Sequence, residues 1–136
     1  MVFAGWSGAI FGCEIVADNA IVRAATPSAK GAALYLSLKN TCLADDKLTG
    51  ASSDSANRAV LHTHDPRSDG VAAMRMAKNG FELPAGEVIE LAPGGDHIML
   101  MGFANGLHQL DALDIELQFK NSDVMLLKVP VAFAGR

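Results

Sequence analysis

The strongest constraint on the fold of this chain is that apolar and polar residues alternate along several short segments. Large apolar residues occupy every second position from Leu34 to Leu38 and again from Leu113 to Phe119. Such alternation is typical of a β-strand that buries one face, whereas a helix repeats every three or four residues. Turn-forming Gly, Asn and Pro residues interrupt the pattern roughly every eight to twelve residues. Further strand segments are expected at 20–25, 58–64, 71–77, 88–92, 97–103 and 124–132.

These segments predict an all-β domain. About nine short strands in one domain are typical of a Greek-key sandwich or a small barrel. With 136 residues, 50% of them hydrophobic, the chain can bury a core as a single domain, which we expect at residues 14–136. The formal net charge is -4, from 11 Lys and Arg against 15 Asp and Glu residues, and no basic run occurs. This composition argues against nucleic acid as a partner.

The first 13 residues are mostly apolar and small, and we interpret residues 1–13 as a leader or targeting remnant. No run reaches the roughly 18 to 20 apolar residues of a membrane-spanning helix, so stable membrane insertion is not expected. Cys13 and Cys42 leave two alternatives open, free thiols or one disulfide, and a disulfide would indicate an oxidising compartment. Cys13 also follows a segment that loosely resembles a lipoprotein cleavage site, so a membrane tether through Cys13 is a further alternative.

Histidine and methionine residues fall in groups that share one face of a predicted strand, because their members are two positions apart. These groups are His62 and His64, Met74 and Met76, and the triplet His97, Met99 and Met101. Where the three strands meet at one end of the domain, imidazole nitrogens and thioether sulfurs converge on one point. We therefore expect a metal site there.

This set of donors favours copper. Imidazole and neutral thioether ligands, without a thiolate or a carboxylate cluster, suit soft Cu(I) in particular. Zinc sites use Cys with His, or His with carboxylate, and calcium and magnesium bind oxygen. Because the donors are neutral and leave the charge of the ion uncompensated, the site is expected near the surface. Exchangeable ligands in a shallow site suit a carrier that hands its metal to a partner better than an enzyme.

The sequence also contains a specific block, Leu91-Ala92-Pro93-Gly94-Gly95-Asp96-His97-Ile98-Met99-Leu100-Met101-Gly102, with shorter matches at Ala33–Asn40, Val60–His62, Met74–Met76 and Leu83–Gly86. Through these residues the chain resembles the PCuAC family of periplasmic copper chaperones. The resemblance implies a cupredoxin-like β-fold, a periplasmic location and binding of Cu(I) by a His, a Met and a later His-x-Met. It also implies delivery of copper to the binuclear centre of cytochrome oxidase, through its subunit II or another copper chaperone as partner.

Carried over to this sequence, the resemblance implies that His62, Met76, His97 and Met99 bind the metal. Thirteen residues separate His62 from Met76 and twenty separate Met76 from His97, whereas counting through Met74 gives eleven and twenty-two. The middle ligand therefore stays open between the two methionines. His64, Met74 and Met101 are reserve ligands. His64 and Met74 would serve either a second copper ion or Cu(II), which tolerates more nitrogen.

Two other functions are alternatives. In a cupin-like metalloenzyme, His62, His64 and His97 would hold a metal ion for Lewis-acid chemistry. Against this reading, no Glu follows His64 at the expected spacing, and Met99 would have no role. In a metal-free assembly or adhesion sandwich, the methionines would pack in the core and the histidines would be solvated.

Overall fold

The computed structural model describes residues 13–65, 73–107 and 110–133. Within these ranges the chain forms β-strands and no helix, which confirms the predicted all-β fold. It follows that the described residues hold no helix that could cross a membrane. The strands are β1 Ile15–Ala24, β2 Gly31–Asn40, β3 Asp46–Ser52, β4 Arg58–Asp65, β5 Ala73–Met76, β6 Phe81–Leu83, β7 Val88–Leu91, β8 His97–Met101, β9 Ala112–Phe119 and β10 Met125–Phe133.

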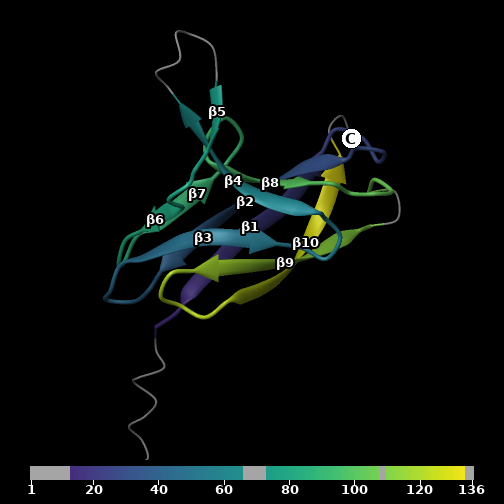
Figure 1. Cartoon of the computed structure of the whole chain (residues 1–136). Coiled ribbons are helices and arrows are strands. Elements are labelled where there is room, and N and C mark those ends of the chain that lie inside the picture. Colours follow the sequence, from purple (N-terminus) through teal and green to yellow (C-terminus); the bar gives the residue numbers. More distant parts are fainter. Residues whose placement is uncertain (1–12, 66–72, 108–109, 134–136) are drawn as a thin grey trace, which may run out of the picture.

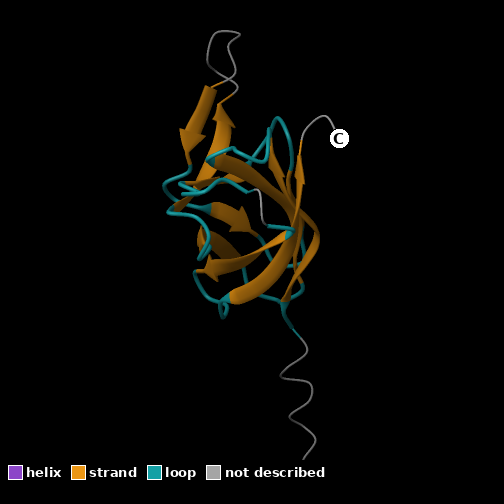
Figure 2. Cartoon of the chain, turned by 90° about the vertical axis from the view of Figure 1, so that its right-hand side faces the viewer, coloured by secondary structure: helices purple, strands orange, loops and turns teal. Residues whose placement is uncertain are grey.

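The strands form one strongly curved sheet that closes almost into a barrel (Figures 1 and 2). The strand order is β5-β4-β8-β2-β1-β10-β9-β3-β6. β7 and β8 both pair with β2, so the chain leaves the sheet after β7 and rejoins it at β8. β1 and β10 pair in parallel, and β3 contacts β4 across the opening of the barrel. The β4–β5 hairpin extends from one end of the barrel, and β1 starts at the other end (Figures 1 and 2).

The hydrophobic core lies inside this barrel and takes one face of each long strand. The leucines that alternate along β2 are at most 2% exposed, and the inward residues of β9 are at most 1% exposed. On β8, Ile98 and Leu100 are fully buried. Because side chains alternate along a strand, the His and Met residues of β8 lie on the face opposite the core.

Two strands were not predicted from the sequence. β3 has a single large apolar residue, Leu48, and a register shift at Gly50, so it shows no clear alternation. β6 has only 3 residues. β1 was also expected to begin at residue 20 but begins at Ile15. Its first part was not recognised because Asn19 has a φ of 56° and a bulge follows Asp18, which together interrupt the alternation of side chains. An interrupted strand hides its periodicity from the sequence pattern.

Cys13 and Cys42 form a disulfide that joins the start of β1 to the loop after β2. Of the alternatives for the cysteines, the structure therefore has the bridge, which is typical of proteins in oxidising compartments. A sulfur atom in this bond cannot also carry a lipid thioether, so the bridged form excludes a tether through Cys13. The leader predicted for residues 1–13 lies outside the described residues, apart from Cys13 itself, and stays a prediction.

Candidate metal centre

Three neighbouring strands bring predicted His and Met positions into one row. His62 of β4 lies directly opposite His97 of β8 on one side and opposite Met76 of β5 on the other. Opposite residues of antiparallel strands share a face, with Cβ atoms roughly 4.5–5.5 Å apart. The row Met76–His62–His97, which we call the metal row, therefore runs across the outer face of the sheet. It lies near the base of the β4–β5 hairpin (Figure 1).

The predicted ligand Met99 and the three reserve positions lie outside the metal row, on both sides of it and on the same face. His64 is opposite Met74, further along the hairpin. In the other direction Met99 lies opposite Val60, and Met101 lies opposite Arg58. The pairing of β4 with β5 and β8 therefore places the His and Met residues of all three strands on one face of the sheet. The same pairing puts Met76, and not Met74, beside His62.

The two imidazole rings of the metal row are in contact. Their centroids are 5.4 Å apart, and the rings meet edge to face at 83°. His97 is only 5% exposed, and the ring of Tyr35 lies beside it with the centroids 6.2 Å apart. The Nδ1 of His97 lies 3.0 Å from the carbonyl oxygen of Gly95. Because a carbonyl only accepts hydrogen bonds, Nδ1 carries the ring proton and Nε2 keeps its lone pair.

No described residue forms a hydrogen bond with the Nε2 of His97. A buried polar atom without a partner is unfavourable and rare in folded proteins. A ring nitrogen that is held in one tautomer, buried and unpartnered is the arrangement that metal-binding histidines adopt. The chemistry of this nitrogen therefore fits a metal ion.

The charge state of His62 also suits metal binding. Burial lowers the pKa of its imidazole, and the electrostatic effects of the neighbouring His97 ring and of Arg58 lower it further. A His whose pKa lies below the ordinary value is unprotonated at neutral pH, and only the unprotonated ring binds a metal. His62 is therefore ready to bind without first losing a proton.

The sulfur atoms are less well gathered than the nitrogens. Met76 is 53% exposed. The terminal methyl group of Met99 lies 3.6 Å from the place where a Cβ on Gly31 would stand. Since Gly31 pairs with Met101, the Met99 side chain points along β8 away from His97. The flexible thioether chain would have to rotate to approach the metal row.

The donors near the metal row narrow the choice of ion. Among the described residues there is no group of three or more His, Cys, Asp or Glu side chains that could hold a metal. Two imidazoles alone do not complete a coordination sphere, so the further donors would be thioethers. That combination favours a soft ion.

The residues that hold the metal row in place were not evident from the sequence. The hydroxyl of Thr63 donates a hydrogen bond to Oδ1 of Asp96 at 2.7 Å, which joins β4 to the loop before β8. Tyr35 packs beside His97 from β2. The alternation along β2 did predict that Tyr35 points away from the core, but it gives no information about the neighbouring strand.

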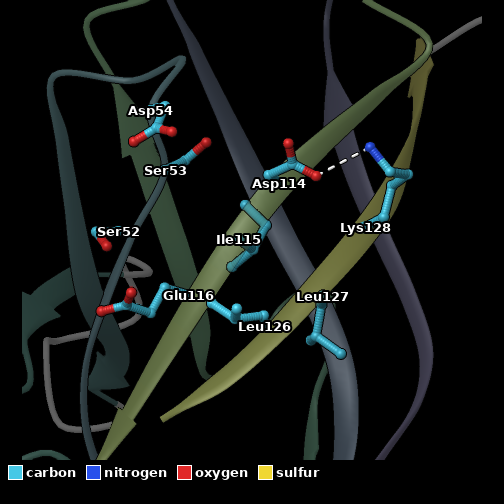
Figure 3. A pocket seen from close by; sticks show the side chains of 9 residues that line it. All are labelled: Ser52, Ser53, Asp54, Asp114, Ile115, Glu116, Leu126, Leu127 and Lys128. Carbon is cyan, nitrogen blue, oxygen red and sulfur yellow. Dashed lines mark hydrogen bonds and ion pairs between the residues drawn. The ribbon is translucent and has the colours of Figure 1, made fainter.

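The surface also has a hollow of about 470 Å³ over the outer face of β9 and β10 and the end of β3 (Figure 3). The ion pair between Lys128 and Asp114, 3.0 Å long, and the 74% exposed Leu126 lie along it. Its lining contains no His, Met or Cys residue. This hollow therefore offers none of the soft donors of the metal row.

Comparison with known proteins identifies relatives that are described as lipoproteins. A family model described as "Putative lipoprotein LpqE-like" matches residues 15–131. A protein of Leifsonia xyli subsp. xyli, described as a "Putative lipoprotein", is 36% identical over 123 residues, which cover 88% of this chain and 74% of that protein. The match spans the whole barrel, from the start of β1 into β10.

Several solved structures share the fold. The solution structure of CuI-DR1885 from Deinococcus radiodurans has a TM-score of 0.71 and 28% identity, and covers 96% of this chain and 87% of that one. The apo PCuAC domain from PmoF1 has a TM-score of 0.70 and 23% identity, with 88% and 93% covered. The copper-bound PCuAC domain from PmoF2 has a TM-score of 0.69 and 20% identity, with 88% and 92% covered. The cupredoxin-like barrel predicted from the sequence is thereby confirmed.

Proposed function

The chain belongs to the LpqE-like family, and on that premise we propose that it is an exported carrier of Cu(I). The observation that carries this proposal is the metal row, in which a buried imidazole, whose Nε2 has no hydrogen-bond partner among the side chains and backbone groups that the structure describes, contacts a second imidazole of lowered pKa. The lipoprotein relatives and the disulfide both support export.

In this proposal His97, His62, Met76 and Met99 bind the ion. His97 uses Nε2, because Nδ1 already donates to the backbone. Met76 stands opposite His62, and Met99 reaches the site by rotating its side chain. His64, Met74 and Met101 remain reserve ligands on the same face, and His64 would add a nitrogen for Cu(II).

Similarity to solved structures that contain copper supports the choice of ion. The structure from Deinococcus radiodurans, which is 28% identical to this chain, is described as containing Cu(I). The PmoF2 domain is described as copper-bound, although at 20% identity it supports the fold alone. We therefore propose that this chain is a member of the wider PCuAC group of copper-binding domains.

The exposure of the site supports a role in transfer. Met76 is 53% exposed and lies on β5, at the end of the strand order, so a partner can approach it from the side of the sheet. All four proposed ligands are neutral when bound, and neutral ligands exchange without separating charges. The partner that we propose is cytochrome oxidase subunit II or another copper chaperone in the periplasm, which the PCuAC resemblance implies.

A carrier accounts for the site better than an enzyme does. A cupin-like enzyme would add a carboxylate to its histidines, and no carboxylate joins the imidazoles among the side chains that the structure describes. We therefore propose no catalytic residues.

A competition titration with a Cu(I) chelator tests the proposal. The unaltered protein should bind Cu(I), and His97→Ala and Met99→Ala should each weaken binding at least about tenfold, which corresponds to about 1.4 kcal/mol per tenfold step. Met125→Ala is the matched control, because Met125 lies on β10 beside the disulfide and away from the metal row. Full affinity in both site variants would refute the site.

A further inference from the structure

We infer that Thr63 and Asp96 form a clamp that positions the His97 imidazole for metal binding, an inference that rests on the proposed function. The two residues are direct neighbours of the two histidines of the metal row, Thr63 following His62 and Asp96 preceding His97. They are 33 positions apart in the sequence, and the Thr63 hydroxyl donates to Asp96 Oδ1 at 2.7 Å.

The clamp continues the pairing of β4 and β8 by one step. The backbone ladder between these strands runs from Arg58 opposite Met101 to His62 opposite His97 and ends there. At the next position the side-chain bond between Thr63 and Asp96 joins the two segments. The metal row thus lies at the last rung of the ladder, where strands normally fray, and the clamp closes that end.

The clamp also fixes the loop that holds the His97 ring. The loop Ala92–Asp96 is closed by a hydrogen bond from Ala92 N to the Asp96 carbonyl at 3.0 Å and one from Gly95 N to the Ala92 carbonyl at 2.9 Å. The Gly95 carbonyl in turn accepts from Nδ1 of His97. Asp96 therefore connects β4 to the loop whose carbonyl selects the His97 tautomer and leaves Nε2 free for the metal.

Neither member of the clamp is placed to bind the metal itself. Thr63 and Asp96 are neighbours of the row residues in sequence, so their side chains point to the opposite face of the sheet. There they line a hollow of about 500 Å³ behind the row. Both are positioning residues. Groups that hydrogen-bond a metal-binding histidine directly typically contribute roughly 10- to 100-fold to the affinity, and the clamp acts one step further out, through the loop that carries the Gly95 carbonyl.

The test compares Thr63→Val, which removes the donor, with Thr63→Ser, which keeps it. Thr63→Val should weaken Cu(I) binding about tenfold, and Thr63→Ser should stay within about twofold of the unaltered protein. Thr49→Val is the matched control, since the Thr49 hydroxyl donates to the Gln118 carbonyl at 3.1 Å between β3 and β9, away from the metal row, and the substitution should leave the affinity unchanged. Asp96→Ala removes the acceptor and should repeat the loss.

A measurement on the metal-free protein separates the clamp from the copper proposal. Nitrogen-15 NMR of the imidazoles should show His97 as the Nδ1-protonated tautomer in the unaltered protein and a mixture of tautomers in Thr63→Val. Thermal unfolding of each variant shows that the fold persists. Equal Cu(I) affinity in Thr63→Val and the unaltered protein, equal losses in Thr63→Val and Thr63→Ser, or an unchanged tautomer would each overturn the clamp. If the unaltered protein does not bind Cu(I), the proposed function fails, and the tautomer still tests the clamp.

Discussion

The two ends of the barrel differ in whether their buried polar groups are hydrogen-bonded. At the end with the disulfide, Asn40 is 1% exposed, and its side-chain amide donates to the carbonyls of Ala44 and Leu83 at 3.0 and 2.9 Å. Asp46, 6% exposed, accepts hydrogen bonds from the backbone nitrogens of Lys47 and Asn121 and from the Ser122 hydroxyl. At the other end, His97 is equally buried but keeps Nε2 without a partner among the described residues.

This difference indicates that the disulfide end has a structural role and that the end with His97 has a role in binding. A buried polar group that is fully satisfied stabilises one conformation, whereas an unsatisfied one costs free energy until a ligand pairs with it. The hydrogen-bonded groups of the disulfide end therefore raise the free energy of unfolding. The unsatisfied Nε2 of His97 lowers it until a metal ion binds. Changes at the first end should alter unfolding with little effect on copper, and changes at the second should do the reverse.

The largest expected effect is the loss of the disulfide. Cys13→Ser together with Cys42→Ser should lower the free energy of unfolding by about 3 kcal/mol, because the cross-link no longer restrains the unfolded chain. Cu(I) affinity should stay within about twofold, since the bridge lies beside the start of β1, and the metal row lies near the base of the β4–β5 hairpin, which extends from the other end of the barrel. Urea unfolding and chelator competition measure the two quantities. A tenfold loss of affinity would show that the two ends are coupled.

Asp46 should have the next largest effect. Burial by itself raises the pKa of Asp46, but the hydrogen bonds from Ser122, Asn121 and Lys47 outweigh it and hold the pKa below the ordinary value of 3.8. Asp46→Ala removes acceptors for these donors and should cost about 2 kcal/mol at pH 7. Asp123→Ala is the control, because Asp123 is exposed and lies on the turn that carries the donors Asn121 and Ser122; this change should cost much less.

The stability contributed by Asp46 should depend on pH in one direction. Because the pKa of Asp46 is lower in the folded than in the unfolded protein, its ionisation stabilises the fold above pH 3.8. That stability is lost as the pH falls through the lower, folded-state pKa. The difference between the unaltered protein and Asp46→Ala should therefore shrink below pH 3.8. An equally large difference at pH 7 and at pH 3 would mean that ionisation of Asp46 contributes nothing.

The same contrast explains what the sequence could predict. The leucines of β2 and the inward residues of β9 follow a strict alternation, so the fold class and the core faces were evident from the residues alone. The His and Met positions of β8 share a face for the same local reason. A property that repeats within one strand is readable, because it needs no knowledge of the neighbouring strand.

Properties that depend on the register between strands or on the loops could not be predicted from the sequence. Whether Met74 or Met76 stands opposite His62 depends on the register of the β4–β5 hairpin. The sequence left the choice between free thiols and a disulfide open, because only the pairing of Ile15 with Asn40 brings the two cysteines together. The bond between Thr63 and Asp96 joins residues 33 positions apart, and neither residue type signals such a partner.

The third prediction uses the hairpin register to identify the middle ligand. Met76→Ala should weaken Cu(I) binding about tenfold, which is about 1.4 kcal/mol, because it removes the thioether opposite His62. Met74→Ala is the matched variant on the same strand and should weaken binding less than about threefold. Chelator competition at pH 7 measures both. The reverse order would make Met74 the middle ligand.

The smallest expected effect concerns Arg58 and the pH range of copper binding. Burial, then the electrostatic effects of His97 and of Arg58, lower the pKa of His62 from the ordinary value of 6.5, so a proton competes with copper for this imidazole at a lower pH than it would for an ordinary histidine. Affinity should therefore be constant from pH 8 to about 6.5 and should fall toward pH 5.

Arg58→Gln removes the last of these three influences and so raises the pKa of His62. The fall in Cu(I) affinity should then begin at a higher pH, with about a twofold difference at pH 6 and none at pH 8, where His62 is unprotonated in both proteins. Lys120→Gln removes a charge at the turn after β9, near the disulfide end, and should leave the pH profile unchanged. A shift of the same size in both variants would mean that net charge, and not the position of Arg58 on the face of the metal row, governs the response. A copper affinity that does not change from pH 8 to pH 5 would show that neither His62 nor His97 binds the metal.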